Sequence, residues 1–115
     1  LMAKQYIDAG CDLLIVHAET STGARSDVQA LCGLAAKYDC LSIVDAVTSL
    51  GGIELQVDDW DIDAVYSGTQ KCLSCVPGLS PVSFSERAGI TTPFIFARVA
   101  GDVFSKIPRK NALSE

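Results

Sequence analysis

The stretch LSIVDAVTSLGG, residues 41–52, decides the fold that the sequence predicts. A short apolar run ends in Asp45 and is followed by turn-forming residues, which is typical of a strand buried on both faces. Two more runs have this form: DLLIVH (12–17), followed by the polar loop AETSTG, and DAVYS (63–67). The sequence therefore predicts three short buried strands.

A helix is expected between the first two strands. Ser26 and Gln29 have the spacing of a capping box, and apolar residues recur at helical intervals from Val28 up to Asp39. A further helix is expected within residues 1–9. Alternation of strand and helix favours parallel pairing with right-handed crossovers. The predicted fold is α/β, a three-layer, mostly parallel sheet with flanking helices.

The remainder of the chain is less regular. LSPVSFS (79–85) predicts a fourth strand, and Pro81 places it at an edge or a bulge. Residues 53–57 alternate apolar and polar side chains, which indicates a half-exposed extended segment. From Gly89 onward no clean period is present, and we expect a divergent or poorly ordered tail over 89–115.

Composition limits the possible functions. The chain has 115 residues, is 49% hydrophobic and has a mean hydropathy of +0.29, enough for one compact core. A net charge of -5 argues against nucleic-acid binding, which needs clustered cations. No apolar run reaches the roughly 20 residues of a membrane helix, and no signal core is present. We expect a soluble cytoplasmic protein, or a peroxisomal or mitochondrial one in a eukaryote.

Five cysteines, an odd number, favour reduced thiols in a cytosol-like compartment. Cys72 and Cys75 have CxxC spacing, so a redox pair and half of a zinc site are alternatives. A second CxxC is absent, and the only histidine, His17, is far away in sequence. No metal is therefore expected. His17 itself is expected to be a packed or hydrogen-bonded residue at a strand end.

Polar clusters follow each of the three predicted strands. They comprise Glu19, Thr20, Ser21 and Thr22 after the first, Asp45 after the second, and Ser67, Thr69, Gln70 and Lys71 after the third. Ligands of open α/β sheets bind just outside the carboxyl ends of the strands. The three clusters should therefore converge on one cleft.

Asp45 and Lys71 together match the needs of pyridoxal phosphate. That cofactor requires an amine to hold its aldehyde and a carboxylate to keep its ring nitrogen protonated. Lys71 is the only Lys or Arg between Lys37 and Arg87. The alternatives are structural: a strand-end Asp is often a cap or turn former, and a single Lys is usually solvated.

Three segments in order, HAETSTG, IVDAVTSLGG and DIDAVYSGTQKCLSCVPGLSPVSFS, resemble the class V, fold-type I pyridoxal-phosphate aminotransferases. The resemblance is strongest to the alanine–glyoxylate and serine–pyruvate branch and covers about residues 2–88. It implies that residues 1–88 are the middle part of the large, cofactor-binding domain of such an enzyme. The family's phosphate turn, its stacking aromatic residue, its C-terminal domain and its carboxylate-binding arginine have no match here. A fragment is therefore expected, and residues 1–115 alone are expected to be at most weakly active.

The resemblance also implies a role for each matching residue. Lys71 would bind the cofactor covalently and act in catalysis, and Asp45 would pair with the ring nitrogen. The other implied cofactor contacts are Val47 on a ring face, Thr20 near the ring hydroxyl, Gln70 at the phosphate or the adjoining backbone, and Ser67 and Thr69 as helpers. Cysteine desulfurases of the same class usually have a histidine where this chain has Gln70, so a desulfurase is disfavoured.

The implied reaction moves an amino group from a small amino acid, alanine or serine, to a 2-oxo acid, glyoxylate or pyruvate, in a homodimeric enzyme. Alternatives with the same cofactor are ureidoglycine–glyoxylate or 2-aminoethylphosphonate–pyruvate transamination, or a lyase. A third possibility is an inactive α/β module that acts only by association.

Overall fold

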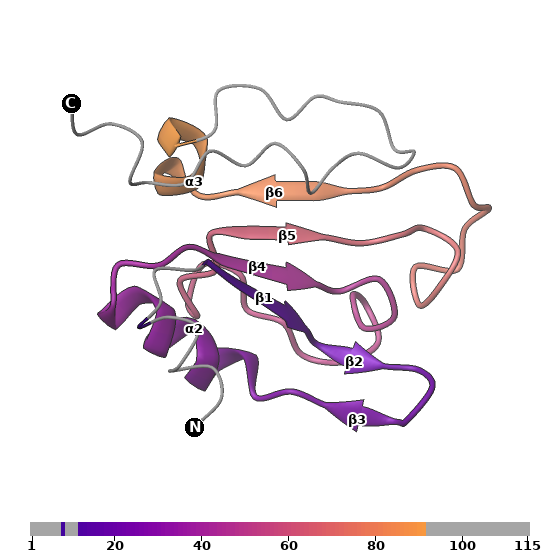
Figure 1. Ribbon diagram of the computed structural model, residues 1–115. Helices are drawn as coiled ribbons and strands as arrows, with labels where there is room; N and C mark the ends of the chain where they lie inside the picture. Colours follow the sequence, from indigo (N-terminus) through magenta and orange to yellow (C-terminus); the bar gives the residue numbers. More distant parts are fainter. Residues whose placement is uncertain (1–7, 9–11, 92–115) are drawn as a thin grey trace.

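A four-stranded sheet forms the centre of the computed structural model, which describes residue 8 and residues 12–91 (Figure 1). Its strands lie in the order β1 (Leu13–Val16), β4 (Ser42–Asp45), β5 (Ala64–Tyr66) and β6 (Val82–Phe84). The first three are parallel to one another, and β6 is antiparallel to β5. All four predicted strands and the mostly parallel α/β class are therefore confirmed.

The strand register aligns the carboxyl ends of the three parallel strands. Val16 pairs with Asp45, and Asp45 pairs with Tyr66. β6 is an edge strand among the described residues, as Pro81 predicted, and the carbonyl of Pro81 accepts a hydrogen bond from Ser67 N at 2.9 Å. The segments that leave β1, β4 and β5 consequently start at one edge of the sheet.

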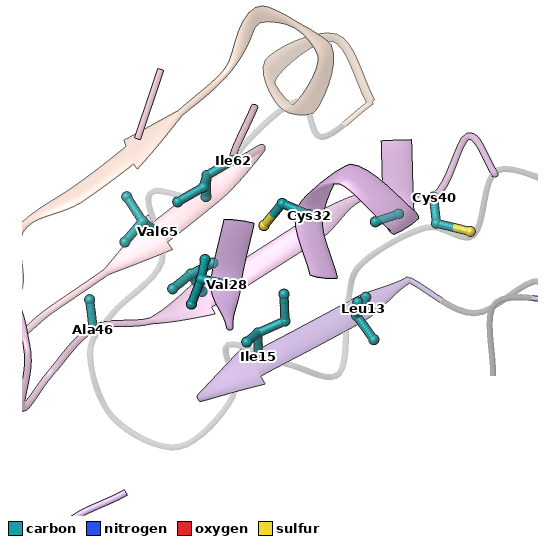
Figure 2. Packing of buried hydrophobic residues seen from close by; sticks show 10 residues of the cluster. Leu13, Ile15, Val28, Cys32, Cys40, Ala46, Ile62 and Val65 are labelled. Atoms are coloured by element: carbon teal, nitrogen blue, oxygen red, sulfur yellow. The ribbon is translucent and has the colours of Figure 1, made fainter. Parts of the chain in front are cut away.

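The hydrophobic core lies between one face of this sheet and α2 (Val28–Lys37) (Figure 2). Alternate residues of the strands point into it, because successive side chains of a strand face opposite sides. Its members are Leu13, Ile15, Val28, Cys32, Ala35, Cys40, Val44, Ala46, Ile62 and Val65. Burial raises the pKa of the Cys32 thiol, which keeps it protonated.

The opposite face of the sheet differs from the prediction of strands buried on both sides. Leu14 is 50% exposed and Val16 is 39% exposed, while Leu13 and Ile15 beside them are buried. The reason is that α2 packs against only one face, and no other described helix covers Leu14 and Val16. For the described residues, β1 is buried on one face only.

The start of α2 also corrects the prediction of a Ser26–Gln29 capping box. Asp27 is the N-cap residue, and its Oδ1 accepts a hydrogen bond from Ala30 N at 3.1 Å. Ser26 Oγ instead donates to the carbonyl of Val16 at 2.7 Å, which ties the helix entry to β1. The helix ends at Lys37 rather than Asp39, because Asp39 takes a left-handed conformation with φ of 57°.

Asp27→Ala is expected to lower the free energy of unfolding by about 1 kcal/mol, the usual effect of losing an N-cap side chain. Asp27→Asn is the matched control and should keep most of the stability, because asparagine caps as well as aspartate does. Urea unfolding of the three proteins, followed by circular dichroism, measures the difference. A loss of stability in Gln29→Ala but not in Asp27→Ala would contradict the assignment and restore the capping box.

Two elements were not predicted. Residues expected to form a polar loop instead form a small antiparallel hairpin of β2 (Ala18–Glu19) and β3 (Ala24–Arg25). A short helix, α3 (Glu86–Thr91), follows β6. The helix expected within residues 1–9 and the tail beyond residue 91 lie outside the described residues, apart from Asp8, which is helical.

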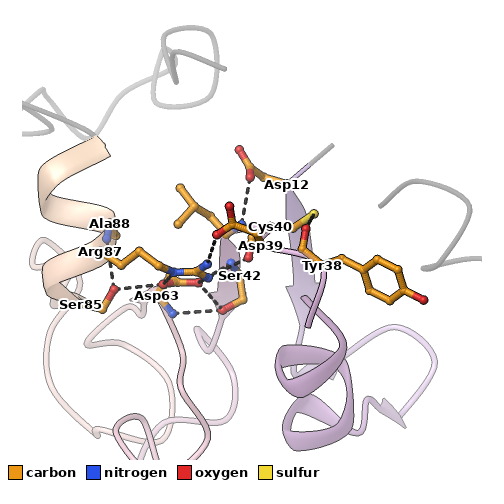
Figure 3. A network of polar contacts seen from close by, with 10 residues as sticks. Asp12, Tyr38, Asp39, Cys40, Ser42, Asp63, Ser85, Arg87 and Ala88 are labelled. Carbon is orange, nitrogen blue, oxygen red and sulfur yellow. Dashed lines mark hydrogen bonds and ion pairs between the residues drawn. The ribbon is translucent and has the colours of Figure 1, made fainter. Parts of the chain in front are cut away.

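At the end of the sheet opposite the aligned carboxyl ends, Asp63 organises a polar network (Figure 3). Asp63 is 3% exposed, and its carboxylate accepts hydrogen bonds from Arg87 Nε at 2.8 Å, from Arg87 Nη2, and from Ser42 N at 2.9 Å. Ser42 Oγ and Ser85 Oγ donate to it as well, at 3.2 and 3.1 Å. This network joins β4, β5 and the start of α3.

Burial alone would raise the pKa of the Asp63 carboxyl. The hydrogen bonds from Arg87, Ser42 and Ser85, together with the Arg87 charge, outweigh burial and hold that pKa below its ordinary value. Arg87 Nη2 also donates to the carbonyl of Cys40 at 2.7 Å, and its Nη1 lies 3.4 Å from Asp39 Oδ1. The ion pair therefore fastens α3 to the loop that precedes β4.

In the described part of the chain, no helix is long and apolar enough to cross a membrane.

Candidate active site

Three segments meet at the carboxyl edge of the sheet: the hairpin after β1, the turn of residues 46–53 after β4, and the loop of residues 67–81 after β5. Thr48 joins them. Its Oγ1 donates to the carbonyl of Ala18 at 2.6 Å, and its own carbonyl accepts a hydrogen bond from Cys72 Sγ at 3.3 Å. The three loops therefore meet at this edge through direct contacts. That they enclose one ligand cleft stays a prediction.

The two glycines of the turn after β4 allow the loop after β5 to approach closely. A Cβ on Gly52 would lie 2.6 Å from Cys72 Sγ, and a Cβ on Gly51 would lie 3.3 Å from Leu73 Cδ2. Gly51 also has a φ of 85°, which L side chains rarely adopt. The residues next to Lys71 thus pack directly on the turn that follows Asp45.

Asp45 is the last residue of β4, and its half-buried carboxylate is held at both oxygens. Oδ1 accepts a hydrogen bond from Val47 N at 2.9 Å, and Oδ2 accepts one from the Tyr66 hydroxyl at 2.8 Å. Burial, followed by the hydrogen bond to Asp45 and the Asp45 charge, raises the pKa of Tyr66 far above its ordinary value. Tyr66 is consequently a hydroxyl donor throughout the physiological pH range.

Lys71 lies on an exposed turn between β5 and β6. Its carbonyl accepts a hydrogen bond from Ser74 N at 2.9 Å, and Ser74 is left-handed with φ of 56°. Within the described residues, the Lys71 ammonium has no hydrogen-bond or ion-pair partner. Gln70 folds back over Gly68, where an added Cβ would lie 2.7 Å from Gln70 Oε1. The Lys71 amine is therefore available to a ligand.

Ser67 and Thr69 are buried and serve the loop itself. Ser67 Oγ donates to the carbonyl of Ala46 at 2.9 Å. Thr69 Oγ1 donates to the carbonyl of Val76 at 2.7 Å and lies 3.3 Å from that of Leu79. Each hydroxyl proton is thus already committed to a backbone carbonyl, and the observed role of both residues is to shape the lysine-bearing loop. Their contact with a phosphate stays a prediction.

Thr20 is exposed in the turn of the hairpin that follows β1. Glu19 stabilises this turn: its Oε1 accepts hydrogen bonds from Ser21 N at 2.8 Å and from Ser21 Oγ at 2.7 Å. These bonds lower the pKa of Glu19. Thr48 anchors the base of the hairpin through the carbonyl of Ala18. The hairpin thus presents Thr20 from a defined position.

His17 is 1% exposed and lies on the core side of the sheet. Its ring meets Trp60 edge-on, with ring centroids 6.4 Å apart and an interplanar angle of 88°. Burial, and then the charge of Arg25, lower the pKa of His17, so it is neutral near pH 7. The prediction of a packed histidine is confirmed.

Cys72 and Cys75 are exposed free thiols. Each donates to a carbonyl, Cys72 to Thr48 and Cys75 to Leu73, both at 3.3 Å. The sequence offered the CxxC spacing as a redox or metal alternative, whereas the structure gives Cys72 a contact role at the turn after β4. Thr48 and Tyr66 are the site residues that sequence reasoning missed. The only signal for either was its place beside a strand end.

The donor set suits pyridoxal phosphate. An amine with no partner among the described residues lies on one loop, and a carboxylate with a free lone pair on each oxygen lies at the end of the neighbouring strand. Hydroxyl and amide groups of Thr20 and Gln70 are exposed at the same edge. These are the groups that hold an aldehyde, a protonated ring nitrogen and polar ring substituents.

This arrangement is the α/β fold of the fold-type I pyridoxal-phosphate transferases. The crystal structure of alanine–glyoxylate aminotransferase from Nostoc sp. superposes with a TM-score of 0.70 at 42% sequence identity, covering 76% of this chain and 23% of that one. The chain belongs to the aminotransferase class-V family, whose model matches residues 2–96.

Two relatives are similar to about two thirds of the chain. The (S)-ureidoglycine–glyoxylate transaminase of Bacillus subtilis is 48% identical over 73 residues, which is 64% of this chain and 18% of that protein. The alanine–glyoxylate aminotransferase of Drosophila melanogaster is 47% identical over 75 residues, 64% of this chain and 19% of that protein. The chain thus spans about a fifth of the length of these relatives.

Proposed function

We propose that this chain supplies the lysine-bearing part of an aminotransferase site that transfers the amino group of a small amino acid, alanine or serine, to glyoxylate or pyruvate. The observation that carries the proposal is the contact between the loop of Lys71 and the turn after Asp45, made by Cys72, Thr48 and Gly52. It supports the proposal because amine and carboxylate must approach one ring from different strands.

When bound, pyridoxal phosphate supplies an electron sink for the charge left by breaking the Cα–H bond of an amino acid. Lys71 would hold the cofactor through its amine and would also move the substrate proton as general base and acid. Asp45 would keep the ring nitrogen protonated, because an adjacent carboxylate favours the cationic form. Val47, Thr20 and Gln70 would hold the ring face, the ring hydroxyl, and the phosphate or the backbone beside it.

The names of the relatives support glyoxylate as the acceptor. The B. subtilis relative also makes (S)-ureidoglycine a second candidate donor, since its identity of 48% is as high as that of the Drosophila alanine–glyoxylate enzyme. Comparing alanine, serine and (S)-ureidoglycine as donors, with glycine formed from glyoxylate as the readout, separates the two candidates. Glycine formed only from (S)-ureidoglycine would replace the first proposal with the second.

Lys71 is expected to carry the cofactor after reduction. The chain is mixed with pyridoxal phosphate, treated with borohydride, digested and mapped by mass spectrometry. A pyridoxyl label should appear on the peptide that contains Lys71, whereas Lys37 on α2 serves as an internal reference lysine and should stay essentially unlabelled. Equal labelling of Lys37 and Lys71, or no label on Lys71, would overturn the proposed cofactor site.

A further inference from the structure

We infer that Tyr66 is a positioning residue for Asp45. Its hydroxyl holds the carboxylate in the orientation with which Asp45 meets the cofactor's ring nitrogen. The inference rests on the proposed function and adds a residue to it. Tyr66 lies five residues before Lys71, in a position that the sequence marked only as the end of an apolar run.

The geometry comes from the pairing of two parallel strands. Asp45 and Tyr66 are register partners at the ends of β4 and β5, and both side chains are half-buried. The Tyr66 hydroxyl donates to Asp45 Oδ2 at 2.8 Å, while Val47 N donates to Oδ1 at 2.9 Å. With a donor on each oxygen, the carboxylate cannot rotate without losing a hydrogen bond.

Each carboxylate oxygen has two lone-pair directions. Tyr66 and Val47 occupy one on each oxygen, so one direction on each remains for an incoming N–H. The backbone donor is fixed by the turn itself, whereas the Tyr66 donor comes from a side chain on the neighbouring strand. Of the two donors that hold the Asp45 carboxylate, only that of Tyr66 can therefore be removed by a side-chain substitution.

Tyr66 is also suited electrostatically to this task. A neutral hydroxyl donor beside a carboxylate keeps the negative charge in place without cancelling it, as a cation would. Burial and the neighbouring Asp45 charge keep the hydroxyl protonated, so this hydrogen bond does not break as pH varies around neutrality. The described partners of Asp45 are these two neutral donors, so no described cation competes with a ring N–H for its oxygens.

The test is a double-mutant cycle between Tyr66→Phe and Asp45→Asn, read out by the affinity for pyridoxal phosphate. In the wild-type background, Tyr66→Phe is expected to weaken binding about ten-fold, which corresponds to about 1.4 kcal/mol, because the Asp45 carboxylate is then held at one oxygen only. In the Asp45→Asn background, the same change should have little further effect, because the carboxylate that Tyr66 positions is gone. Tyr38→Phe is the matched tyrosine control and should leave binding unchanged.

A second readout is the ¹⁵N resonance of cofactor labelled at the ring nitrogen. It is expected to shift toward the unprotonated value in Tyr66→Phe and to stay at the wild-type value in Tyr38→Phe. If Tyr66 only stabilised the fold, Tyr66→Phe would leave the ring protonation unchanged, and its effect on affinity would be the same in the wild-type and Asp45→Asn backgrounds. Equal losses of affinity in both backgrounds, or an unchanged resonance in Tyr66→Phe, would overturn the inference.

The outcomes also separate this inference from the proposed function. If borohydride labels Lys71 and Asp45→Asn weakens binding, while Tyr66→Phe binds normally, then only the role of Tyr66 fails. If Lys71 is not labelled and Asp45→Asn has no effect, the proposed function fails, and the inference falls with it.

Discussion

Lys71→Ala is expected to lower the rate of transamination between alanine and glyoxylate by at least about 10³-fold, within the range that one acid–base group contributes. The loss should exceed that of any other single change at the site, because Lys71 is proposed both to attach the cofactor and to move the substrate proton. No other Lys or Arg lies between Lys37 and Arg87 to replace it. Formation of glycine from glyoxylate, catalysed by the full-length enzyme that contains this chain, measures the rate.

Two variants give this experiment its controls. Lys71→Arg keeps a positive charge at the same turn, but its guanidinium stays protonated and cannot attach to an aldehyde, so its activity should be as low as that of Lys71→Ala. Lys37→Ala removes an exposed lysine from α2 and should have the wild-type rate. A Lys71→Ala protein that retains more than a tenth of the wild-type rate would contradict the assigned role.

Arg87→Met is expected to give the largest change in stability, a fall of about 2–3 kcal/mol in the free energy of unfolding. Removing one partner of a fully buried ion pair typically costs about 3–5 kcal/mol, and the partial exposure of Arg87 places the expected value below that range. The variant leaves the buried Asp63 carboxylate with hydroxyl and backbone donors only. Urea unfolding at pH 7 measures the difference.

The pH dependence of this effect follows from the lowered pKa of Asp63. The carboxylate contributes its full stabilisation above the unfolded pKa, about 3.9, and that contribution is lost as pH falls through the lower folded pKa. In Arg87→Met the lowering by Arg87 is removed, and burial is opposed only by the hydrogen bonds from Ser42 and Ser85. The folded pKa of Asp63 should therefore be higher than in the wild type, and unfolding by acid should begin at a higher pH. Identical acid-unfolding curves for wild type and Arg87→Met would show that the pair contributes no pH-dependent stability.

The strand segments show how far local sequence predicts this fold. Three of the four strands follow from a short apolar run with turn residues after it. The fourth was predicted from LSPVSFS, where Pro81 correctly indicated an edge. The main error concerned β1, which was predicted to be buried on both faces. An apolar run shows that both faces of a strand carry hydrophobic side chains, but it does not show which element covers each face. In the described residues, α2 covers only the face with Leu13 and Ile15.

The cap of α2 shows a limit of a different kind. Ser26 and Gln29 satisfy the spacing of a capping box, and Asp27 is an equally good cap one residue later. Local propensity does not separate them. The Ser26 hydroxyl instead donates a hydrogen bond to the carbonyl of Val16 in β1. That contact exists only after the strand and the helix have packed together.

By itself, the sequence determined the order of the four strands of the main sheet and the helix between the first two. Through that order it placed Asp45 and Lys71 at one edge of the parallel strands. Apolar periodicity and turn residues act over a few positions, so these features can be read locally. Only the tertiary structure decided that Tyr66 holds Asp45, that Thr48 joins three loops, and that Arg87 neutralises Asp63. Those partners are 21–30 residues apart, and such contacts depend on strand register and on the approach of loops, which no local pattern encodes.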